Sequence, residues 1–234
     1  MRFDVLTLFP ESIDNFLNES IIGRAREKGL ITINTYNIRD FSKDKHKKVD
    51  DYPYGGGSGM VMMPQPVYDA WQYAVSTFPK KPKTIYMSPQ GTLLTQEVAM
   101  GLRKEENLII ICGHYEGMDE RIIETIVDEE ISIGDYVLTG GELPALVLAD
   151  AVARLCDGVL ASPECFEQES LFSGLLEYPH YTRPEVWHGR EVPEVLLSGH
   201  HKNIESWRRE QSLKITKEKR PDLLAEREKF LDDE

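Results

Sequence analysis

The chain has 234 residues with a formal net charge of −13, and 41% of its residues are hydrophobic. This length fits one large domain, or one large and one small domain, and the hydrophobic content excludes wholesale disorder. No apolar run approaches the roughly 20 residues of a membrane helix, and the first segment, which carries Asp4 and lacks a cleavage-like site, is not expected to be a signal peptide.

Cysteine and histidine spacing argues against a structural metal site. Cys112, Cys156 and Cys165 form no C-x-x-C pair, and the six histidines show no H-x-x-x-H spacing. We therefore predict no metal ligands. The cysteines favour a reduced, cytoplasmic setting in which Cys112 and Cys156 are small buried hydrophobes.

Strands and helices alternate along the first two thirds of the chain. Alternating or short apolar runs predict strands at residues 3–9, 31–38, 84–87, 107–112 and 130–133. Helical spacing predicts helices at residues 10–28, 67–78, 95–104, 119–127 and 143–155. This order predicts an α/β fold, and the fully apolar run 107–112 is typical of a parallel sheet that is covered on both faces.

Details of two helices can be predicted in the same way. In the first helix, Ile13, Phe16, Leu17 and Ile21 should share one face, and Gly29 should supply the left-handed residue at its end. Thr95 is expected to cap the helix that follows it.

A long polar loop covers residues 42–66 and contains the glycine-rich stretch 55–59. Connections of this length are usually functional or mobile. The glycines act either as a flexible hinge or as a surface that another group approaches closely.

The composition changes after Leu160. Residues 161–174 are polar, and residues 201–228 form a polar helical segment with a thin apolar stripe of Trp207, Leu213, Ile215 and Leu223. We predict a main domain at 1–160, a flexible linker at 161–174 and a small helical domain at 175–234, which is lean in core residues.

Three glycine-rich loops follow predicted strands, at residues 88–91, 113–117 and 132–142. Such loops let a ligand approach the backbone closely, and the ends of parallel strands meet at one edge of a sheet. We therefore expect one composite pocket. No G-x-G-x-x-G follows the first strand and no G-x-x-x-x-G-K-[ST] occurs, which disfavours ordinary dinucleotide and P-loop sites.

Three charged residues have two interpretations each. Arg154 either pairs with Asp150 at a helix end or acts on a ligand. Glu169 is either a solvated acid of the linker or a functional carboxylate. Glu116, which lies between two glycines, either accepts hydrogen bonds from a ligand or caps the helix near Asp119.

The charge distribution leaves an RNA partner open. The net negative charge argues against nucleic acid. Two basic runs, residues 43–48 and 202–220, are either solvated faces or phosphate contacts.

Short segments spaced along nearly the whole chain carry a family resemblance. They are Phe3–Pro10, Tyr54–Met60, Met87–Gly91, Cys112–Arg121, Ser132–Glu142, Tyr178–Pro184 and Leu196–His200. Together they resemble the bacterial tRNA (guanine-N1)-methyltransferases of the SPOUT superfamily.

The resemblance implies a parallel-sheet SPOUT domain with a C-terminal trefoil knot, a small helical C-terminal domain, and a homodimer whose active sites are shared between subunits. It implies S-adenosylmethionine as the methyl donor and N1 of the guanine immediately 3′ of the tRNA anticodon, position 37, as the acceptor. It leaves room for Mg²⁺, which is not required for donor binding. It implies no association with a membrane.

By motif match, the resemblance also implies site residues. The donor contacts would be Tyr86, Met87, Ser88, Pro89, Gly91, Gly113, Glu116, Ser132, Ile133, Gly134, Asp135, Tyr136, Val137, Leu138, Gly140, Gly141 and Pro144. The RNA contacts would be Lys43, Lys45, Lys47, Lys48, Gly59, His180, Tyr181, Arg183, Arg208, Arg209 and Lys214.

Two residues receive catalytic roles from the resemblance. Guanine N1 carries a proton, so a carboxylate must remove it, and negative charge then builds on O6. The family places the base at the position of Glu169 and a stabilising arginine at that of Arg154. Many members carry aspartate where this chain has Glu169, which is one methylene longer.

Three other functions are alternatives to this one. Another SPOUT RNA methyltransferase, acting on a ribose 2′-OH or a different base, would not need an acid to deprotonate guanine N1. A catalytically silent RNA-binding module would not need the glycine loops. A hydrolase that pairs Glu116 with Glu169 has no fixed spacing to support it.

Overall fold

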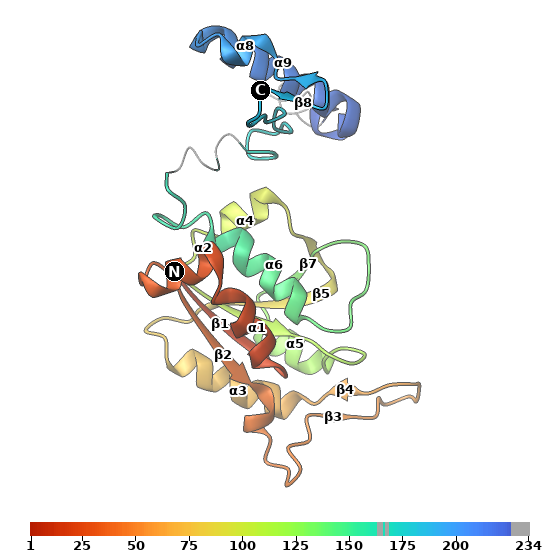
Figure 1. Cartoon of the computed structure of the whole chain (residues 1–234). Coiled ribbons are helices and arrows are strands. Elements are labelled where there is room, and N and C mark those ends of the chain that lie inside the picture. The colour runs from red at the N-terminus through yellow and green to blue at the C-terminus, as the bar shows by residue number, and fades with distance from the viewer. Residues whose placement is uncertain (163–165, 167–168, 226–234) are drawn as a thin grey trace, which may run out of the picture. The chain divides into compact units, whose positions relative to one another are not determined.

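The computed structural model describes residues 1–162, residue 166 and residues 169–225. The chain forms two compact units, Met1–Ser162 and Pro163–Glu234 (Figure 1). Cys165, several residues of the predicted linker and the predicted helical residues 226–228 lie outside the described residues.

A five-stranded parallel sheet forms the centre of the first unit. Its strands are β1 (Arg2–Thr7), β2 (Thr32–Asn37), β5 (Lys83–Leu93), β6 (Asn107–Cys112) and β7 (Glu129–Ser132). Their order across the sheet is β2-β1-β6-β5-β7, and every neighbouring pair is parallel. The predicted α/β fold with a parallel sheet is confirmed, and the apolar run 107–112 is one of its central strands.

Helices cover both faces of this sheet. The helices are α1 (Pro10–Leu17), α2 (Ser20–Glu27), α3 (Pro64–Ser76), α4 (Gln96–Leu102), α5 (Glu120–Ile126) and α6 (Glu142–Ala153). α3 packs against α5 on one face, and α6 packs against α1 and α4 on the other (Figure 1).

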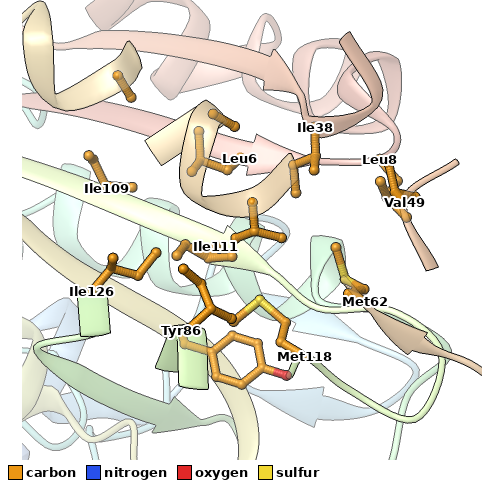
Figure 2. Close-up of a cluster of buried hydrophobic side chains, with 14 residues drawn as sticks. Leu6, Leu8, Ile38, Val49, Met62, Tyr86, Ile109, Ile111, Met118 and Ile126 are labelled. Carbon is orange, nitrogen blue, oxygen red and sulfur yellow. The ribbon is translucent and has the colours of Figure 1, made fainter. Parts of the chain in front are cut away.

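The core between the sheet and the helices α3 and α5 is closely packed. Leu6, Ile109 and Ile111 from the strands are fully buried, and they meet Val67 of α3 and Ile126 of α5 (Figure 2). Each such side chain contributes about 1.5–3 kcal/mol through its removal from water. This layer makes the strand ends a rigid support for the loops that leave them.

The predicted first helix is in fact two helices, and part of its predicted apolar face is wrong. The backbone leaves the helical conformation at Ser20, whose φ is 56°, so α2 begins on a new axis. Ile13 is buried as expected, but Phe16 is 56% exposed and Ile21 is 39% exposed. Gly29, with φ of 69°, ends α2 as predicted.

Two further boundaries differ from the sequence prediction. The loop 42–66 contains a short antiparallel pair, β3 (Asp50–Asp51) and β4 (Val61–Met62), and α3 already begins at Pro64. Proline is favourable at the first position of a helix because it needs no hydrogen-bond acceptor there. A 3₁₀ turn, η1 (Ile38–Phe41), precedes the loop.

Strand β5 is also longer than predicted. It runs past residue 87 to Leu93, because the register against β7 shifts between Met87 and Thr92. The predicted Thr95 cap is confirmed, since its hydroxyl accepts a hydrogen bond from the Val98 N–H at 3.2 Å.

The second unit contains more than helices. A hairpin, β8 (Val186–Trp187) and β9 (Arg190–Glu191), turns through His188 and Gly189, which both have positive φ. Helix α8 (Glu194–Leu197) and helix α9 (His201–Lys219) follow. The purely helical prediction missed this hairpin.

The predicted long helix 201–228 is interrupted at Arg220. Pro221 disfavours helical backbone at the residue before it, so α9 ends there. Its buried residues are Ser212 and Thr216, whereas Leu213 is 41% exposed. The Leu176 N–H donates to the Thr216 hydroxyl at 2.9 Å, which ties the preceding segment to α9.

Candidate functional site

A cavity of about 380 Å³ lies at the carboxyl ends of β5, β6 and β7. Three segments line it: the part of β5 around residues 86–90, the loop 113–118 that follows β6, and the loop 133–141 that follows β7. The sheet topology brings together the three glycine-rich loops that the sequence predicts to form one pocket.

Most of the residues predicted to contact a ligand line this cavity. They are Tyr86, Met87, Ser88, Pro89, Gly113, Glu116, Ser132, Ile133, Gly134, Tyr136, Val137, Leu138, Gly140, Gly141 and Pro144. Gly91 and Asp135 do not line it. A Cβ on Gly91 would collide with the backbone of Glu130 and Ile131, so this glycine lets β5 and β7 approach each other.

Two glycines form the closest crossing of the loops. A Cβ on Gly141 would lie 2.7 Å from the Cα of Cys112 and 2.8 Å from the Gly113 nitrogen. The Gly141 N–H donates to the Gly113 carbonyl at 2.8 Å. No residue with a side chain fits between these backbones, so the crossing requires glycine.

The loop after β7 lies at the solvent-exposed mouth of the cavity. Gly134 has φ of 147°, and its N–H donates to the Ser132 hydroxyl at 3.2 Å. Tyr136 is 54% exposed and Val137 is 82% exposed, although both line the cavity. Apolar side chains held open at a cavity mouth are available to cover an entering ligand.

The structure contradicts one of the two interpretations of Glu116, the capping of α5. Asp119 caps α5, because its carboxylate accepts the Arg121 N–H at 3.0 Å. Glu116 instead lines the cavity, and its carboxylate fills the space where Gly59 would carry a side chain. Gly59 is therefore a position of close approach, while nothing lies within 4 Å of a Cβ on Gly55, Gly56 or Gly57.

Backbone hydrogen bonds join the loop 113–118 to the segment that carries Gly59. The Glu116 N–H donates to the Met60 carbonyl at 3.0 Å, and the Met62 N–H donates to the Gly117 carbonyl at 2.9 Å. The β3–β4 arm, defined as residues 50–62, thus forms part of the support for the cavity wall.

Carboxylates give the cavity a negative character. Glu116, Glu120 and Glu130 all line it. Burial, and then the charge of Glu130, raises the pKa of Tyr86 to about 12, so this phenol stays protonated at neutral pH. Such a lining attracts a cationic ligand.

Sequence analysis missed several lining residues, among them Gln90, His114, Tyr115, Glu120 and Glu130. Three of them lie inside the segment Cys112–Arg121, which did carry a recognisable motif. Glu130 gave no such signal, because only the register of β7 places it beside Tyr86.

The two residues expected to be catalytic lie in different units. Arg154 follows α6 as its C-terminal cap, is half-buried and does not line the cavity. Glu169 belongs to the second unit, is half-buried, and its N–H donates to the Phe166 carbonyl at 3.1 Å.

The basic run 43–48 is exposed and partly paired. Lys43 lies 3.2 Å from a carboxylate oxygen of Asp69, and Lys48 lies 3.0 Å from one of Asp51. Lys47 donates to the Asp40 carbonyl at 3.3 Å. Lys45 is exposed as well. These contacts are at the surface, where ion pairs are weak and can be exchanged for phosphates.

In the second unit, aromatic and basic side chains cluster. His180 is 2.9 Å from the Glu177 carboxylate, and its ring lies 4.9 Å from that of Tyr178. The Arg208 guanidinium lies 4.7 Å above the Tyr178 ring. A separate group, Tyr181, Arg183, Arg209 and Lys214, is exposed. Arg208 thus has a packing role that the sequence did not predict.

The described residues contain neither a cluster of metal ligands nor a membrane-spanning helix. Among residues 1–162, 166 and 169–225, no group of three or more His, Cys, Asp or Glu side chains could hold a metal ion. Within the same ranges, no helix is long and apolar enough to cross a membrane.

The fold and cavity define a three-layer α/β protein with a cavity built on glycine loops at the carboxyl edge of its sheet, the edge at which open α/β sheets bind small molecules. Residues 1–226 match the family described as tRNA (Guanine-1)-methyltransferase TrmD. The chain belongs to this family, as its sequence motifs predicted.

Relatives over nearly the whole chain carry the same name. A tRNA (guanine-N(1)-)-methyltransferase of Ruminiclostridium cellulolyticum is 66% identical over 223 residues, covering 95% of this chain and 96% of the relative. A relative of the same name from Clostridioides difficile is 58% identical over 95% of this chain and 97% of the relative. A relative of the same name from Lachnospira eligens is 56% identical over 100% of this chain and 99% of the relative.

Proposed function

We propose that this protein transfers a methyl group from S-adenosylmethionine to N1 of the guanine immediately 3′ of the anticodon in tRNA. The observation that carries the proposal is the cavity, in which three glycine loops meet in a chain that matches its family over residues 1–226. Because the proposed substrate is tRNA, we expect the activity in the cytoplasm.

The cavity residues fit the methyl donor. The donor carries a positively charged sulfonium, and Glu116, Glu120 and Glu130 supply the opposite charge. Gly113 and Gly141 let the loops after β6 and β7 pack backbone against backbone, and this packing shapes the wall that would face the donor. When bound, S-adenosylmethionine supplies an already activated methyl group, so Mg²⁺ is not required for donor binding and would assist only at the RNA or the carboxylates.

The chemistry on the acceptor is assigned to two side chains. Glu169 accepts the proton from guanine N1, which turns the ring nitrogen into a nucleophile. Arg154 stabilises the negative charge that develops on O6 during this step. A ribose methyltransferase or a silent RNA-binding module would not need this pair, and the names of the relatives favour the guanine reaction.

The domain organisation belongs to the same proposal. We assign methyl transfer to a knotted domain at residues 1–160, a linker role to 161–174, and tRNA binding to 175–234. Support for the knot comes from the path of the chain after β7. It returns across the end of β6, where Gly141 abuts Cys112 and Gly113, before α6 packs on the sheet.

The length of α6 supports a site shared between two subunits. At 1.5 Å per residue, the helix carries Arg154 about 20 Å from Gly141, too far for its side chain to return to the same cavity. Leu143 and Val147 lie between them and are 60% and 48% exposed. If two copies pack these residues together about a two-fold axis near Val147, Arg154 of one copy approaches Gly141 of the other.

Mixed dimers test this arrangement. Arg154→Ala and Glu169→Gln should each be nearly inactive alone, because each removes one member of the catalytic pair. Mixing the two variants should restore activity in a fraction of the dimers if Arg154 and Glu169 of one site come from different chains. The measurement is methyl transfer after subunit exchange. Monomeric behaviour at micromolar concentration in sedimentation would contradict the shared site.

Each unit carries proposed RNA contacts: the run 43–48 and Gly59 in the first unit, and the exposed residues Tyr181, Arg183, Arg209 and Lys214 in the second. Lysines and arginines contact phosphates, which fixes the position of the RNA. Tyr181 is 48% exposed and can stack on an unpaired base, which is the usual way in which single-stranded RNA is recognised.

Salt dependence separates the roles of the two neighbouring arginines on α9. Arg209→Gln should reduce the slope of log K against log salt for tRNA binding by about one unit, because one phosphate contact is lost. Arg208→Gln should mainly lower the thermal stability, because its guanidinium packs on Tyr178. The double variant should lose one to two units of slope.

The control for this experiment is Lys80→Gln, an exposed residue of the first unit outside the proposed RNA surface. It should leave the slope unchanged. If the double arginine variant also keeps the full slope, neither arginine contacts a phosphate, and the run 43–48 becomes the main phosphate contact.

The function itself is tested by methyl transfer to tRNA transcripts. A transcript with guanine 3′ of the anticodon should accept one methyl group on N1, and the same transcript with adenosine there should accept none. Methylation of a ribose, or equal methylation of both transcripts, would reject the proposal.

A further inference from the structure

The glycine loops around the cavity lack the side chains that usually fix a loop by packing. Gly113, Gly117, Gly140 and Gly141 contribute only backbone, and glycine is the residue with the most conformational freedom to lose. A cavity that binds a ligand well needs its walls held in place before the ligand arrives. Hydrogen bonds must therefore restrain these loops, and the backbone bond from Gly141 to Gly113 supplies only part of this restraint.

One chain of polar side chains joins the two loops to the first strand. His114 Nε2 lies 2.7 Å from Glu142 Oε2. The Thr7 hydroxyl donates to the other oxygen, Oε1, at 2.5 Å. Thr7 Oγ1 in turn accepts the Phe9 N–H at 2.9 Å. We refer to these three residues, Thr7, Glu142 and His114, as the polar seam.

The seam is largely buried, and both carboxylate oxygens of Glu142 have a hydrogen-bond partner. Thr7 is buried, and the side chains of His114 and Glu142 are 16% and 12% exposed. The Phe9 ring packs on the imidazole, with ring centres 5.0 Å apart. Glu142 lies in the first turn of α6, where the helix dipole favours a carboxylate. Hydrogen bonds to a carboxylate are stronger in the low dielectric of a buried site than in water, so Glu142 restrains both partners.

The seam lies directly against a cavity glycine. A Cβ on Gly140 would collide with the His114 imidazole and would lie 2.7 Å from Glu142 Oε2. His114 and Gly140 also form an isolated backbone bridge. Fixing the imidazole therefore fixes the loop 113–117 against the loop 139–142, and Thr7 anchors both to the end of β1.

We propose that His114 is a positioning residue for the methyl donor, held by Glu142 and Thr7 so that the two glycine loops keep the spacing that the donor needs. This inference rests on the proposed donor site. It assigns no step of the chemistry to the seam, since the Thr7 hydroxyl and the imidazole bind the same carboxylate rather than each other.

Two substitutions of His114 distinguish the seam from a direct contact with the donor. A glutamine amide reaches roughly as far as Nε2, so His114→Gln should keep the bond to Glu142 and bind S-adenosylmethionine within about threefold of the wild type. An asparagine amide ends near Nδ1 and cannot reach Glu142. His114→Asn should raise the Kd about tenfold, as expected for the loss of a hydrogen bond to a charged group.

Thr7→Val supplies a second test at the far end of the seam, because it removes the hydroxyl and keeps the shape. It should also raise the donor Kd, by about threefold or more. The matched control is Thr35→Val, which removes a hydroxyl that donates to the Asp14 carboxylate at 3.0 Å and does not line the cavity. It should leave donor affinity unchanged even if it lowers the thermal midpoint.

The readouts are calorimetric Kd for S-adenosylmethionine without RNA, the KM values for donor and for tRNA, and the thermal midpoint. The seam variants should raise the Kd and KM of the donor and leave the KM of tRNA unchanged. If they lower only the midpoint, or if Asn at 114 binds normally while Gln does not, the inference is overturned. If the wild type binds no donor, the proposed function fails instead.

Discussion

Gly141→Ala is expected to raise the Kd for S-adenosylmethionine by at least about 100-fold while the fold survives. The added Cβ would meet the Cα of Cys112 and the nitrogen of Gly113, at 2.7 and 2.8 Å. Both are backbone atoms at the end of a central strand, so the loop after β7 must move instead. Displacements of about 1 Å in a site commonly cost about 10²-fold in function.

Calorimetry measures this effect directly, and circular dichroism shows whether the fold is kept. Gly101→Ala is the matched control, since a Cβ there has nothing within 4 Å and Gly101 lies in α4, away from the cavity. This control should bind the donor normally and gain a little stability from the better helix former. Normal affinity in Gly141→Ala would remove the loop from the donor site.

Glu169→Gln is expected to lower the single-turnover rate of methyl transfer by about 10²-fold or more, the usual scale for the loss of a general base. The amide has nearly the same shape but cannot accept the N1 proton. Donor affinity should not change, because Glu169 lies in the second unit, whereas the cavity is built by the first.

Two further variants make this experiment specific. Glu169→Asp should remain active, because aspartate is the usual residue at this position in the family. Glu124→Gln neutralises an exposed acid of α5 that does not line the cavity, and it should leave the rate unchanged. A normal rate in Glu169→Gln would place the base elsewhere, and Glu116 would be the next candidate.

The sequence predicted the features that depend on local pattern. The apolar run of β6 predicted a buried parallel strand, and the three glycine loops predicted a cavity at one edge of the sheet. Both follow from rules about single strands and about the ends of parallel strands. The family followed from the motifs in the same loops and is confirmed by the match over residues 1–226.

The features that the sequence missed depend on tertiary placement. Nothing in the helical pattern of residues 10–28 indicates that Ser20 adopts φ of 56° and splits the helix. The polar seam joins Thr7 to Glu142, which is 135 positions away along the chain. The packing of the Arg208 guanidinium over the ring of Tyr178 could not be predicted from the charged run that contains Arg208. Such contacts appear only when the elements are packed.

The hydrogen bonds between the β3–β4 arm and the loop 113–118 have a thermodynamic consequence. Gly59 touches Glu116, and Met60 and Met62 share backbone bonds with Glu116 and Gly117. If RNA contacts the arm as proposed, a movement of the arm on RNA binding reaches the cavity wall through these contacts. By linkage, any factor by which RNA changes the affinity for the donor is the factor by which the donor changes the affinity for RNA. On the proposed function, the arm therefore couples the two substrates as heterotropic effectors of each other.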